Sequence, residues 1–569
     1  MTVKRGSEVL IGREDATYAG SYNIIGGQRS GEIQFDMGSA ESTSKTSAGL
    51  WQEFMDGGTV RRISLDGGGV VVDDSDLDAI FAAVMGASTR HQELAFLLPG
   101  LGMIHASFHV PSFQTTGELD QPEEFTIRCA STGTVVHVPG VTSRYDMRAS
   151  LVLDFINASY WTGGAHSADF DALSDVTTTR ASKAWADNYD GTDGGIFGDL
   201  VEFAVDATRI DTLGLLTEGG VTNEIRNARF EGGTPGDLSG AGVPPTNMLI
   251  GAAGGLTWTL DEVGLEDGNP YMQLSAAGTW SGDARIDLEQ ATQIAAADGD
   301  FWTVGMGARL VSGALGADFQ IGVFERTGAG ATVASQLETK AIDASRRRFW
   351  KASTLAGGGT VGAVSPVIYF DNGVGTVAFV IRLYSPQIEN YLHASSPVLP
   401  TIASPAATTR AFEVIEVAGG SWINSAAAHS LVAEVSPRIS SPTGYSASTP
   451  FVVGMADVDY SEYLYCYQSG ANFINRINAA GAGILSGNHL DSVVLGQAAR
   501  IAISYADNDM HEALGGDSTA SSSSGAFANQ PISLRLGNIG GSFWQGRIRK
   551  VSYLPYSLSA FETADSVEL

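Results

Sequence analysis

Cysteines are rare in this sequence, and a long apolar run is missing. The 569 residues include two cysteines, Cys129 and Cys466, so no disulfide framework is expected, and such usage is typical of a chain that folds in a reducing cytoplasm. The N-terminal residues lack the apolar run of a signal peptide. No stretch of about 18 apolar residues occurs, so no membrane insertion is expected.

Positive charge is scarce as well. Lys and Arg number 33 against 63 Asp and Glu, which gives a formal net charge of -30. A protein that grips DNA neutralises phosphates with Lys and Arg, so this balance argues against nucleic-acid binding. It suits a surface past which DNA slides without sticking, although an acidic surface also simply aids solubility.

Glycine and apolar residues are plentiful by contrast. The chain has 70 glycines, and 43% hydrophobic with 17% charged residues is the composition of a folded protein. A length of 569 residues is too great for one hydrophobic core and predicts several domains. Many short strand-like pieces between Gly-rich turns predict a mainly β fold.

The first 149 residues are predicted to form a twisted sheet with one helix. Strands are expected at 31–37, 59–65, 93–98, 103–110 and 124–130. The clearest is 103–110, in which every second residue is apolar: Ile104, Ala106, Phe108 and Val110. The helix is expected between Ser75, a suitable N-cap, and Gly86, which offers a stop.

Three stretches of this region carry a family resemblance. They are MTVKRGSEVLIG, the segment that runs from GGQRSGEIQFDMGSAES to DLDAIFAAVMG, and MIHASFHVPSFQTTGELDQPEEFTIRCASTG. Together they resemble the major tail tube proteins of long-tailed (siphovirus-type) phages and the related gene transfer agents. The resemblance implies a structural virion protein and a tail tube β-sandwich or barrel domain.

What the resemblance implies about assembly is specific. Six N-terminal domains would form a homo-hexameric ring whose sheets join into a continuous barrel, and the rings would stack into a tube. Genome DNA would pass through the lumen without specific binding. Tape-measure, tail terminator and tip proteins would be partners, and the chain would be synthesised in the host cytoplasm and reside in the phage tail.

A long loop within this domain is a candidate contact between rings. Residues 38–58 are polar at first and then carry four large apolar residues, Leu50, Trp51, Phe54 and Met55. Long loops inside compact domains are usually functional, and in tail tube proteins the corresponding loop reaches a neighbouring subunit. The four residues are therefore candidate ring-stacking anchors. The alternative is a short helix packed in the core of the same subunit.

Beyond the N-terminal domain, residues 1–149, three further units are expected. Residues 150–219 are a connector with short strands. Residues 220–400, with pieces such as GLTWTLDEV and VAFVIRLYSPQIE, resemble a β-sandwich of the carbohydrate-binding-module type. Residues 401–569, which end in ISLRLGNIGGSFWQGRIRKVSYLPYSLSAFE, resemble a laminin-G or concanavalin-like sandwich. Both sandwiches would be jelly-roll-like and would lie outside the tube.

Aromatic residues of the two sandwiches are the candidates for ligand binding. Exposed rings stack on sugars, which would suit adhesion to a host-surface glycan. The candidates are Trp258, Tyr271, Trp280, Tyr463, Tyr465, Tyr467 and Trp544. The alternative is that these rings belong to the cores, because aromatic residues bury large areas and favour strands.

No catalytic, metal-binding or cofactor-binding signature stands out. His105 and His109 share one strand face, but four residues of strand separate them by roughly 13 Å. The acidic run before the predicted helix lacks the Gly and Glu that a calcium loop requires. The chain is therefore not expected to be an enzyme. The alternative to the tube subunit is a low-copy receptor-binding or tail-tip adhesin that its N-terminal domain docks onto the tail.

Overall fold

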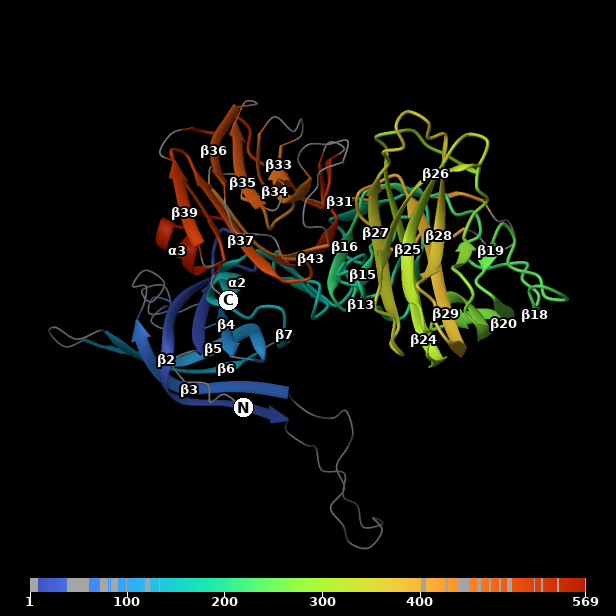
Figure 1. Cartoon of the computed structure of the whole chain (residues 1–569). Helices are drawn as coiled ribbons and strands as arrows, with labels where there is room; N and C mark the ends of the chain where they lie inside the picture. The colour runs from blue at the N-terminus through green and yellow to red at the C-terminus, as the bar shows by residue number, and fades with distance from the viewer. Residues whose placement is uncertain are drawn as a thin grey trace, which may run out of the picture.

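The chain is mainly β, as the sequence predicts, and its strands gather in three bodies (Figure 1). The computed structural model describes residues 9–37, 61–71, 80, 82, 91–98, 100–117, 123–132, 134–400, 406–424, 428–438, 450–457, 462–469, 472–479, 482–488, 494–515, 517–522, 525–539 and 542–567. Two short helices, α2 (Arg144–Arg148) and α3 (Ala560–Asp565), stand out in this described part. No helix among the described residues is long and apolar enough to cross a membrane.

The N-terminal domain is built on one antiparallel sheet. The sheet runs in the order β4 (His91–Leu98), β1 (Leu10–Glu14), β2 (Tyr22–Met37), β3 (Arg61–Val71), β6 (Glu124–Ser131), β5 (Gly102–Thr116) and β7 (Val136–Val138). Because β4 also pairs with β5, the first six strands of this order close into a ring within one chain.

Alternation along the strands fills the interior of that ring. The four apolar residues predicted to share one face of β5 are all buried, with Phe108 and Val110 at 0% exposure. Strand β6 alternates in the same way, with Phe125, Ile127 and Cys129 buried. Of the predicted helix, Ile80 is helical and fully buried, and most of the remainder lies outside the described residues.

The C-terminal sandwich draws its strands from two distant parts of the chain. One sheet follows the order β10 (Ala165–Ser167), β9 (Ser159–Thr162), β8 (Leu151–Asp154), β43 (Gly546–Leu554), β32 (Ala428–Pro437), β37 (Ala499–Ala506), β38 (Asp509–Leu514) and β39 (Asp517–Ser522), and the hairpin of β15 (Ile210–Asp211) and β16 (Gly214–Thr217) joins it at β43. The other follows β11 (Val176–Thr179), β31 (Val414–Ala418), β40 (Ser533–Leu536), β33 (Phe451–Ala456), β34 (Tyr463–Ser469), β35 (Asn472–Ala479) and β36 (Ala482–Asn488).

The stretch expected as a connector thus supplies strands to this sandwich. Strands β8 and β16 both pair with β43, and β11 pairs with β31. Leu151, Leu153 and Leu215 are fully buried in the same hydrophobic cluster as Ile548 and Val551 of β43. On this ground we propose that the C-terminal sandwich is a discontinuous domain, interrupted in sequence by the middle sandwich.

The middle sandwich packs two antiparallel sheets face to face. One has the order β13 (Gly195–Ile196), β27 (Arg347–Thr354), β24 (Phe301–Gly313), β29 (Thr376–Glu389), β21 (Asn269–Thr279), β20 (Leu256–Glu266) and β18 (Gly236–Asp237). The other has β19 (Leu249–Ala253), β22 (Ala284–Asp287), β28 (Ala363–Asp371), β25 (Asp318–Arg326) and β26 (Thr332–Thr339), with β23 (Ile294–Ala295) on β28. One large apolar cluster fills the space between them.

Three small two-stranded sheets complete the described part. They are β12 (Ala184–Ala186) with β14 (Val201–Phe203), β17 (Val221–Asn223) with β30 (Thr408–Arg410), and β41 (Asn538–Ile539) with β42 (Ser542–Phe543). The β17–β30 pair brings the entry and exit of the middle sandwich side by side. The C-terminal sandwich lies directly on the N-terminal domain, and the middle sandwich lies beside the C-terminal sandwich (Figure 1).

Because its core needs strands from both parts of the chain, residues 401–569 expressed alone should not fold. Without β8, β11 and β16, two sheets lose edge strands and the core loses Leu151, Leu153 and Leu215. Residues 150–569 should show a cooperative thermal transition by circular dichroism, and residues 401–569 should show none. A cooperative transition in the shorter fragment would contradict the discontinuous domain.

Candidate assembly interface and the joints around it

One part of the N-terminal sheet has no partner strand on either side among the described residues. Strand β1 pairs with β2 over 22–27, and β4 pairs with β5 over 102–109. Strands β2 and β5 run past these points with a partner on one side each, so β2, β3, β6 and β5 form a four-stranded open sheet with free outer edges in the described part of the chain. Its two edges are residues 30–37 of β2 and 111–116 of β5. A strand edge presents rows of N–H and C=O groups that another strand can pair with.

The two edges run in opposite directions. Three successive antiparallel pairings, β2 with β3, β3 with β6 and β6 with β5, separate them. If the β2 edge of one copy met the β5 edge of another copy rotated about a common axis, the contact would be antiparallel as well. The open sheet can therefore continue from copy to copy with every strand antiparallel to its neighbours.

One face of the open sheet is apolar up to both edges. Its middle consists of buried residues such as Leu65 and Ile127. At the β5 edge Phe113 stacks on Phe125, with their ring centroids 6.2 Å apart. At the β2 edge Phe35 is 55% exposed, which is unusual for a phenylalanine. Each edge thus carries an aromatic side chain on the face that the sheet otherwise buries.

The opposite face is polar and exposed. Glu32 lies opposite Asp66, and Asp66 lies opposite Arg128. The Arg128 Nε donates a hydrogen bond to Asp66 Oδ2 at 2.9 Å, so the charge of Arg128 is paired. A hollow of about 340 Å³ opens on this side, between Glu32 and Gln34 of β2 and residues of the β5 edge. Glu32 and Asp66 thus place two carboxylates on this face.

The predicted ring-stacking residues Leu50, Trp51, Phe54 and Met55 lie outside the described residues. Their role therefore stays a prediction. The open sheet itself was missed by the sequence analysis. The edges arise from unequal strand lengths, which the sequence pattern does not reveal: β2 has 16 residues and β5 has 15, against 5 for β1 and 8 for β4.

The aromatic candidates of the middle sandwich are buried. Trp258 and Trp280 are 2% and 7% exposed and belong to the core between the sheets. Tyr271 is 9% exposed, donates to Glu262 at 2.9 Å, and has the Arg382 guanidinium 4.1 Å above its ring. No face of these rings is open to a sugar.

The candidates of the C-terminal sandwich are packed as well. Trp544 is fully buried, and its Nε1 donates to Gln468 Oε1 at 2.9 Å. Tyr463, Tyr465 and Tyr467 share one face of β34, as their spacing indicates, but Tyr465 and Tyr467 are each 8% exposed. Phe451 stacks on Tyr465 at 5.7 Å. These positions match the alternative that the rings are core residues.

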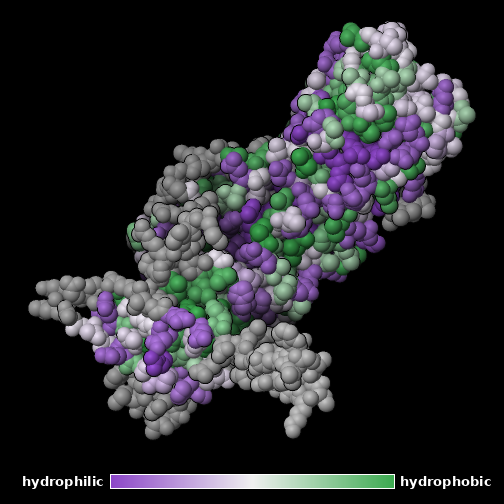
Figure 2. Space-filling model, turned by 90° about the horizontal axis from the view of Figure 1, so that it is seen from below, coloured by the Kyte–Doolittle hydropathy of each residue, from purple (hydrophilic) through white to green (hydrophobic). Residues whose placement is uncertain are grey.

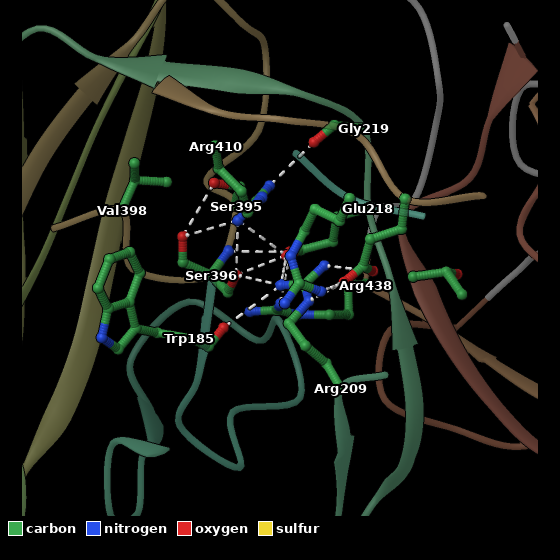
Figure 3. A network of polar contacts seen from close by, with 12 residues as sticks. Trp185, Arg209, Glu218, Gly219, Ser395, Ser396, Val398, Arg410 and Arg438 are labelled. Atoms are coloured by element: carbon green, nitrogen blue, oxygen red, sulfur yellow. Dashed lines mark hydrogen bonds and ion pairs between the residues drawn. The ribbon is translucent and has the colours of Figure 1, made fainter. Parts of the chain in front are cut away.

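A buried ionic cluster joins the two sandwiches (Figure 3). Arg209 and Glu413, both fully buried, form a two-pronged ion pair: Nε to Oε1 is 2.8 Å and Nη2 to Oε2 is 2.9 Å. Arg209 also reaches Glu218 at 2.8 Å. Arg180 completes the group by pairing with Glu413.

Glu218 is the centre of the cluster. Arg410 and Arg438 approach its two carboxylate oxygens at 3.0 and 2.7 Å, in addition to Arg209. The backbone N–H of Ser396, at the exit of the middle sandwich, donates to it at 2.8 Å. Burial alone would raise the pKa of Glu218, but the three guanidinium groups outweigh burial and hold the pKa well below its ordinary range. The cluster thus ties both sandwiches to one carboxylate.

Glu389 lies at the edge of this cluster and behaves differently. It is fully buried and accepts hydrogen bonds from the backbone N–H and hydroxyl of Ser395, at 3.1 and 2.6 Å. Burial raises the pKa of Glu389 to about 7, which these bonds and Arg410 only partly offset. Near neutral pH this carboxyl is therefore poised between its two protonation states. Glu389 was not predicted from the sequence, because no local pattern marks a carboxyl that is buried by long-range packing.

Other ionisable groups give no sign of a metal site. Among the residues that the structure describes, no group of three or more His, Cys, Asp or Glu side chains is arranged to hold a metal ion. His105 and His109 lie on the same strand, and His109 pairs with His91 across the sheet, with ring centroids 5.6 Å apart. Cys129 and Cys466 are both free thiols and buried.

Comparison with known proteins identifies the N-terminal domain. Residues 3–137 match the family described as "Phage tail tube protein". This match supports a structural tail tube role for the N-terminal domain. Among curated protein sequences no significant match to the chain was found.

Three solved structures illustrate the likenesses of the separate parts. The tail of an empty gene transfer agent particle, determined with sixfold symmetry, is 28% identical, covering 24% of this chain and 98% of that one, with a TM-score of 0.21. A family 4 carbohydrate-binding module is 17% identical over 29% and 98% of the two chains, with a TM-score of 0.20. Domains LG4–5 of the mouse laminin α1 chain are 9% identical over 50% and 92%, with a TM-score of 0.18.

Replacing Glu389 with Gln should stabilise the protein at pH 8 and leave it unchanged near pH 4. The folded pKa of about 7 lies above the ordinary value of 4.5, so the unfolded chain releases this proton first as pH rises. Stability contributed by the protonated carboxyl is complete below pH 4.5 and lost by pH 7, a difference of about 3 kcal/mol at most.

The guanidinium denaturation midpoints of the native chain and Glu389→Gln at the two pH values test this expectation. Glu202→Gln, which removes an exposed partner of Lys183, serves as a control and should shift neither midpoint appreciably. An equal effect of Glu389→Gln at both pH values would show that the carboxyl does not titrate in this range.

Proposed function

We propose that this chain is the major tail tube subunit of a phage-type virion. Copies of its N-terminal domain join through the edges of the four-stranded open sheet, the β2 edge of one copy against the β5 edge of the next. The observation that carries the proposal is the pair of antiparallel edges without a described partner, in a domain that matches tail tube proteins. A closed ring of copies would leave no edge exposed.

The two faces of the open sheet assign an inside and an outside. The polar face with Glu32 and Asp66 would line the lumen, where carboxylates repel DNA phosphates and let the genome slide. The apolar face would pack toward the rest of the domain and toward the neighbouring copy. Phe35 at one edge would then meet the Phe113 region at the other, which accounts for its exposure.

Each ring would contain six copies, as the resemblance to tail tube proteins implies, and rings would stack head to tail. Contacts of that kind propagate without a limit of their own, so tail length would be set by other proteins. The tape-measure, terminator and tip proteins belong to this part of the proposal. The loop at 38–58 remains the candidate for the contact between rings.

The two sandwiches would lie outside the tube. The C-terminal sandwich contacts the start of β2 at Tyr22 and of β5 at Met103, whereas the open edges lie near Gln34 and Thr115. Twelve residues of straight strand span roughly 40 Å, so the sandwich leaves both edges accessible. Figure 2, seen from below, shows hydrophilic and hydrophobic residues mixed over this side of the molecule, as on a solvent-exposed surface.

Glycan binding by the sandwiches stays a separate proposal. Many copies of a weakly binding domain along a tail would give useful avidity. Because six of the seven aromatic candidates are buried and Tyr463 is half-buried, such binding would need another face of the sandwiches. It is tested independently of tube formation by a glycan array.

Replacing Phe35 with Asp should abolish assembly and leave the fold intact. The side chain is already 55% exposed in the single chain, so the change costs little stability, whereas a carboxylate at the apolar seam between copies would be desolvated without a partner. Electron microscopy and sedimentation of the full chain should show tubes for the native protein and dispersed chains for Phe35→Asp.

Val374→Asp provides a matched control. Val374 is 70% exposed and lies in the middle sandwich, away from the open sheet, so this variant should assemble like the native chain. Normal tubes from Phe35→Asp, or loss of tubes from both variants, would contradict the assigned seam.

A further inference from the structure

The joint between the N-terminal domain and the C-terminal sandwich is an apolar cluster with histidines at one side. Tyr22, Met103 and Val138 contribute from the N-terminal domain, and Trp161 and Leu554 from the sandwich. The Trp161 Nε1 donates to the carbonyl oxygen of Gly20 at 2.9 Å.

The backbones approach closely at this point. A Cβ on Gly20 would lie 2.3 Å from the backbone nitrogen of Gly164 in the β9–β10 hairpin, and both glycines have positive φ. The contact is therefore specific to glycine at these positions and leaves no space for a layer of water.

Two histidines, one from each domain, lie at this joint, and a third, His137, lies on a neighbouring strand. The ring of His105, on β5, lies 4.7 Å from the Trp161 ring and 5.9 Å from the Tyr22 ring. Its Nε2 is buried without a hydrogen-bond partner among the described residues. His166, on β10 of the sandwich, has its Nε2 3.1 Å from Ser159 Oγ. His137 lies on β7, which pairs with β5.

The surroundings keep His105 and His166 neutral at neutral pH. Burial, together with the neighbouring His166, lowers the pKa of His105 to about 4. Burial also lowers the pKa of His166, and His137 adds to this effect. The other ionisable groups around the cluster are Tyr22, whose pKa burial raises, and the acids Glu14 of β1 and Glu93 of β4, which act on Tyr22.

The other side of the joint is a clasp of ion pairs between α2 and the end of the chain. Ser143 caps the N-terminus of helix α2, and its side chain accepts a hydrogen bond from the Asp146 N–H. Arg148 pairs with Glu562 of α3 at 2.9 Å, and the Tyr145 hydroxyl donates to Asp565 at 2.7 Å. Lys550 of β43 pairs with the buried Asp146 at 2.5 Å.

The clasp keeps its charges in mild acid. Burial opposes ionisation of Asp146, yet Lys550 and Ser552 outweigh it and lower its pKa. The pKa of Glu562 is lowered against burial by the Ser559 N–H and Arg148, and that of Asp565 is lowered chiefly by the Tyr145 hydroxyl. These pairs therefore persist at a pH at which histidines protonate.

We propose that the joint is an acid-operated hinge, in which protonation of His105 and His166 parts the histidine side while the clasp of α2 and α3 holds the other. Protonation would place like charges inside an apolar cluster, which separation into water relieves. The result is a sandwich that is fixed to the tube at neutral pH and swings away from it in acid.

The size of the effect follows from His105. With a pKa of about 4 in the closed joint and an ordinary value of 6.5 in the open one, lowering the pH from 7 to 5 favours opening by about 20-fold. His166 acts in the same direction. The stability of the closed joint is complete above pH 6.5 and is lost as pH falls toward 4.

Hydrogen–deuterium exchange of the full chain tests the hinge. Peptides that cover residues 15–22 and 159–164 are compared at pH 7 and pH 5, with exposure times scaled to equal intrinsic exchange. Their protection should fall roughly 20-fold or more at pH 5, because opening exposes both segments. Peptides of α2 and α3 should keep their protection. Unchanged protection of the joint peptides at pH 5 would overturn the proposal.

Variants separate the histidines from general acid effects. The double variant His105→Phe/His166→Gln should keep its protection at pH 5, and the single variant His166→Gln, at a half-buried position, should show a smaller fall than the native chain. His91→Gln, an exposed histidine outside the joint, should behave like the native chain. The proposal would also be overturned if His166→Gln and the folded double variant lost as much protection at pH 5 as the native chain.

Discussion

The requirement that backbone N–H and C=O groups find partners governs the N-terminal domain. Most of its sheet meets this requirement within one chain, because β4 pairs with both β1 and β5 and closes the ring. The requirement fails where β1 and β4 end and the longer strands β2 and β5 continue. Two exposed edges in one domain invite association. In the tube proposed above, these two edges are the means of assembly, and the part of the sheet that closes within one chain supports them.

The outer part of the chain depends on a different kind of interaction. Removing charges from water is costly, and the cluster around Glu218 and Glu413 is stable only because each carboxylate meets several guanidinium groups in good geometry. Such a cluster adds little net stability compared with apolar packing, but it tolerates only one arrangement of its partners. Through Ser396 it also holds the segment that leaves the middle sandwich, while the apolar joint at Trp161 connects the C-terminal sandwich to the N-terminal domain.

Local patterns in the sequence predicted what depends on local structure. The alternation of Ile104, Ala106, Phe108 and Val110 located β5 and its buried face, and the spacing of the three tyrosines placed them on one face of β34. Whether a face is covered depends on distant segments, so Phe451 over Tyr465 was not foreseeable. The same holds for Arg209 and Glu413, which lie 204 residues apart in sequence. The open edges depend on where strands end, which periodicity locates poorly.

The central claim concerns the hydrogen bonds between copies, and a cryo-electron microscopy map of the assembled full-length chain tests it most directly. The account predicts antiparallel backbone pairing between residues 30–37 of one copy and 111–116 of the next, with Glu32 and Asp66 facing the lumen. A tube whose copies touch through other surfaces, with these two edges left in solvent, would contradict it.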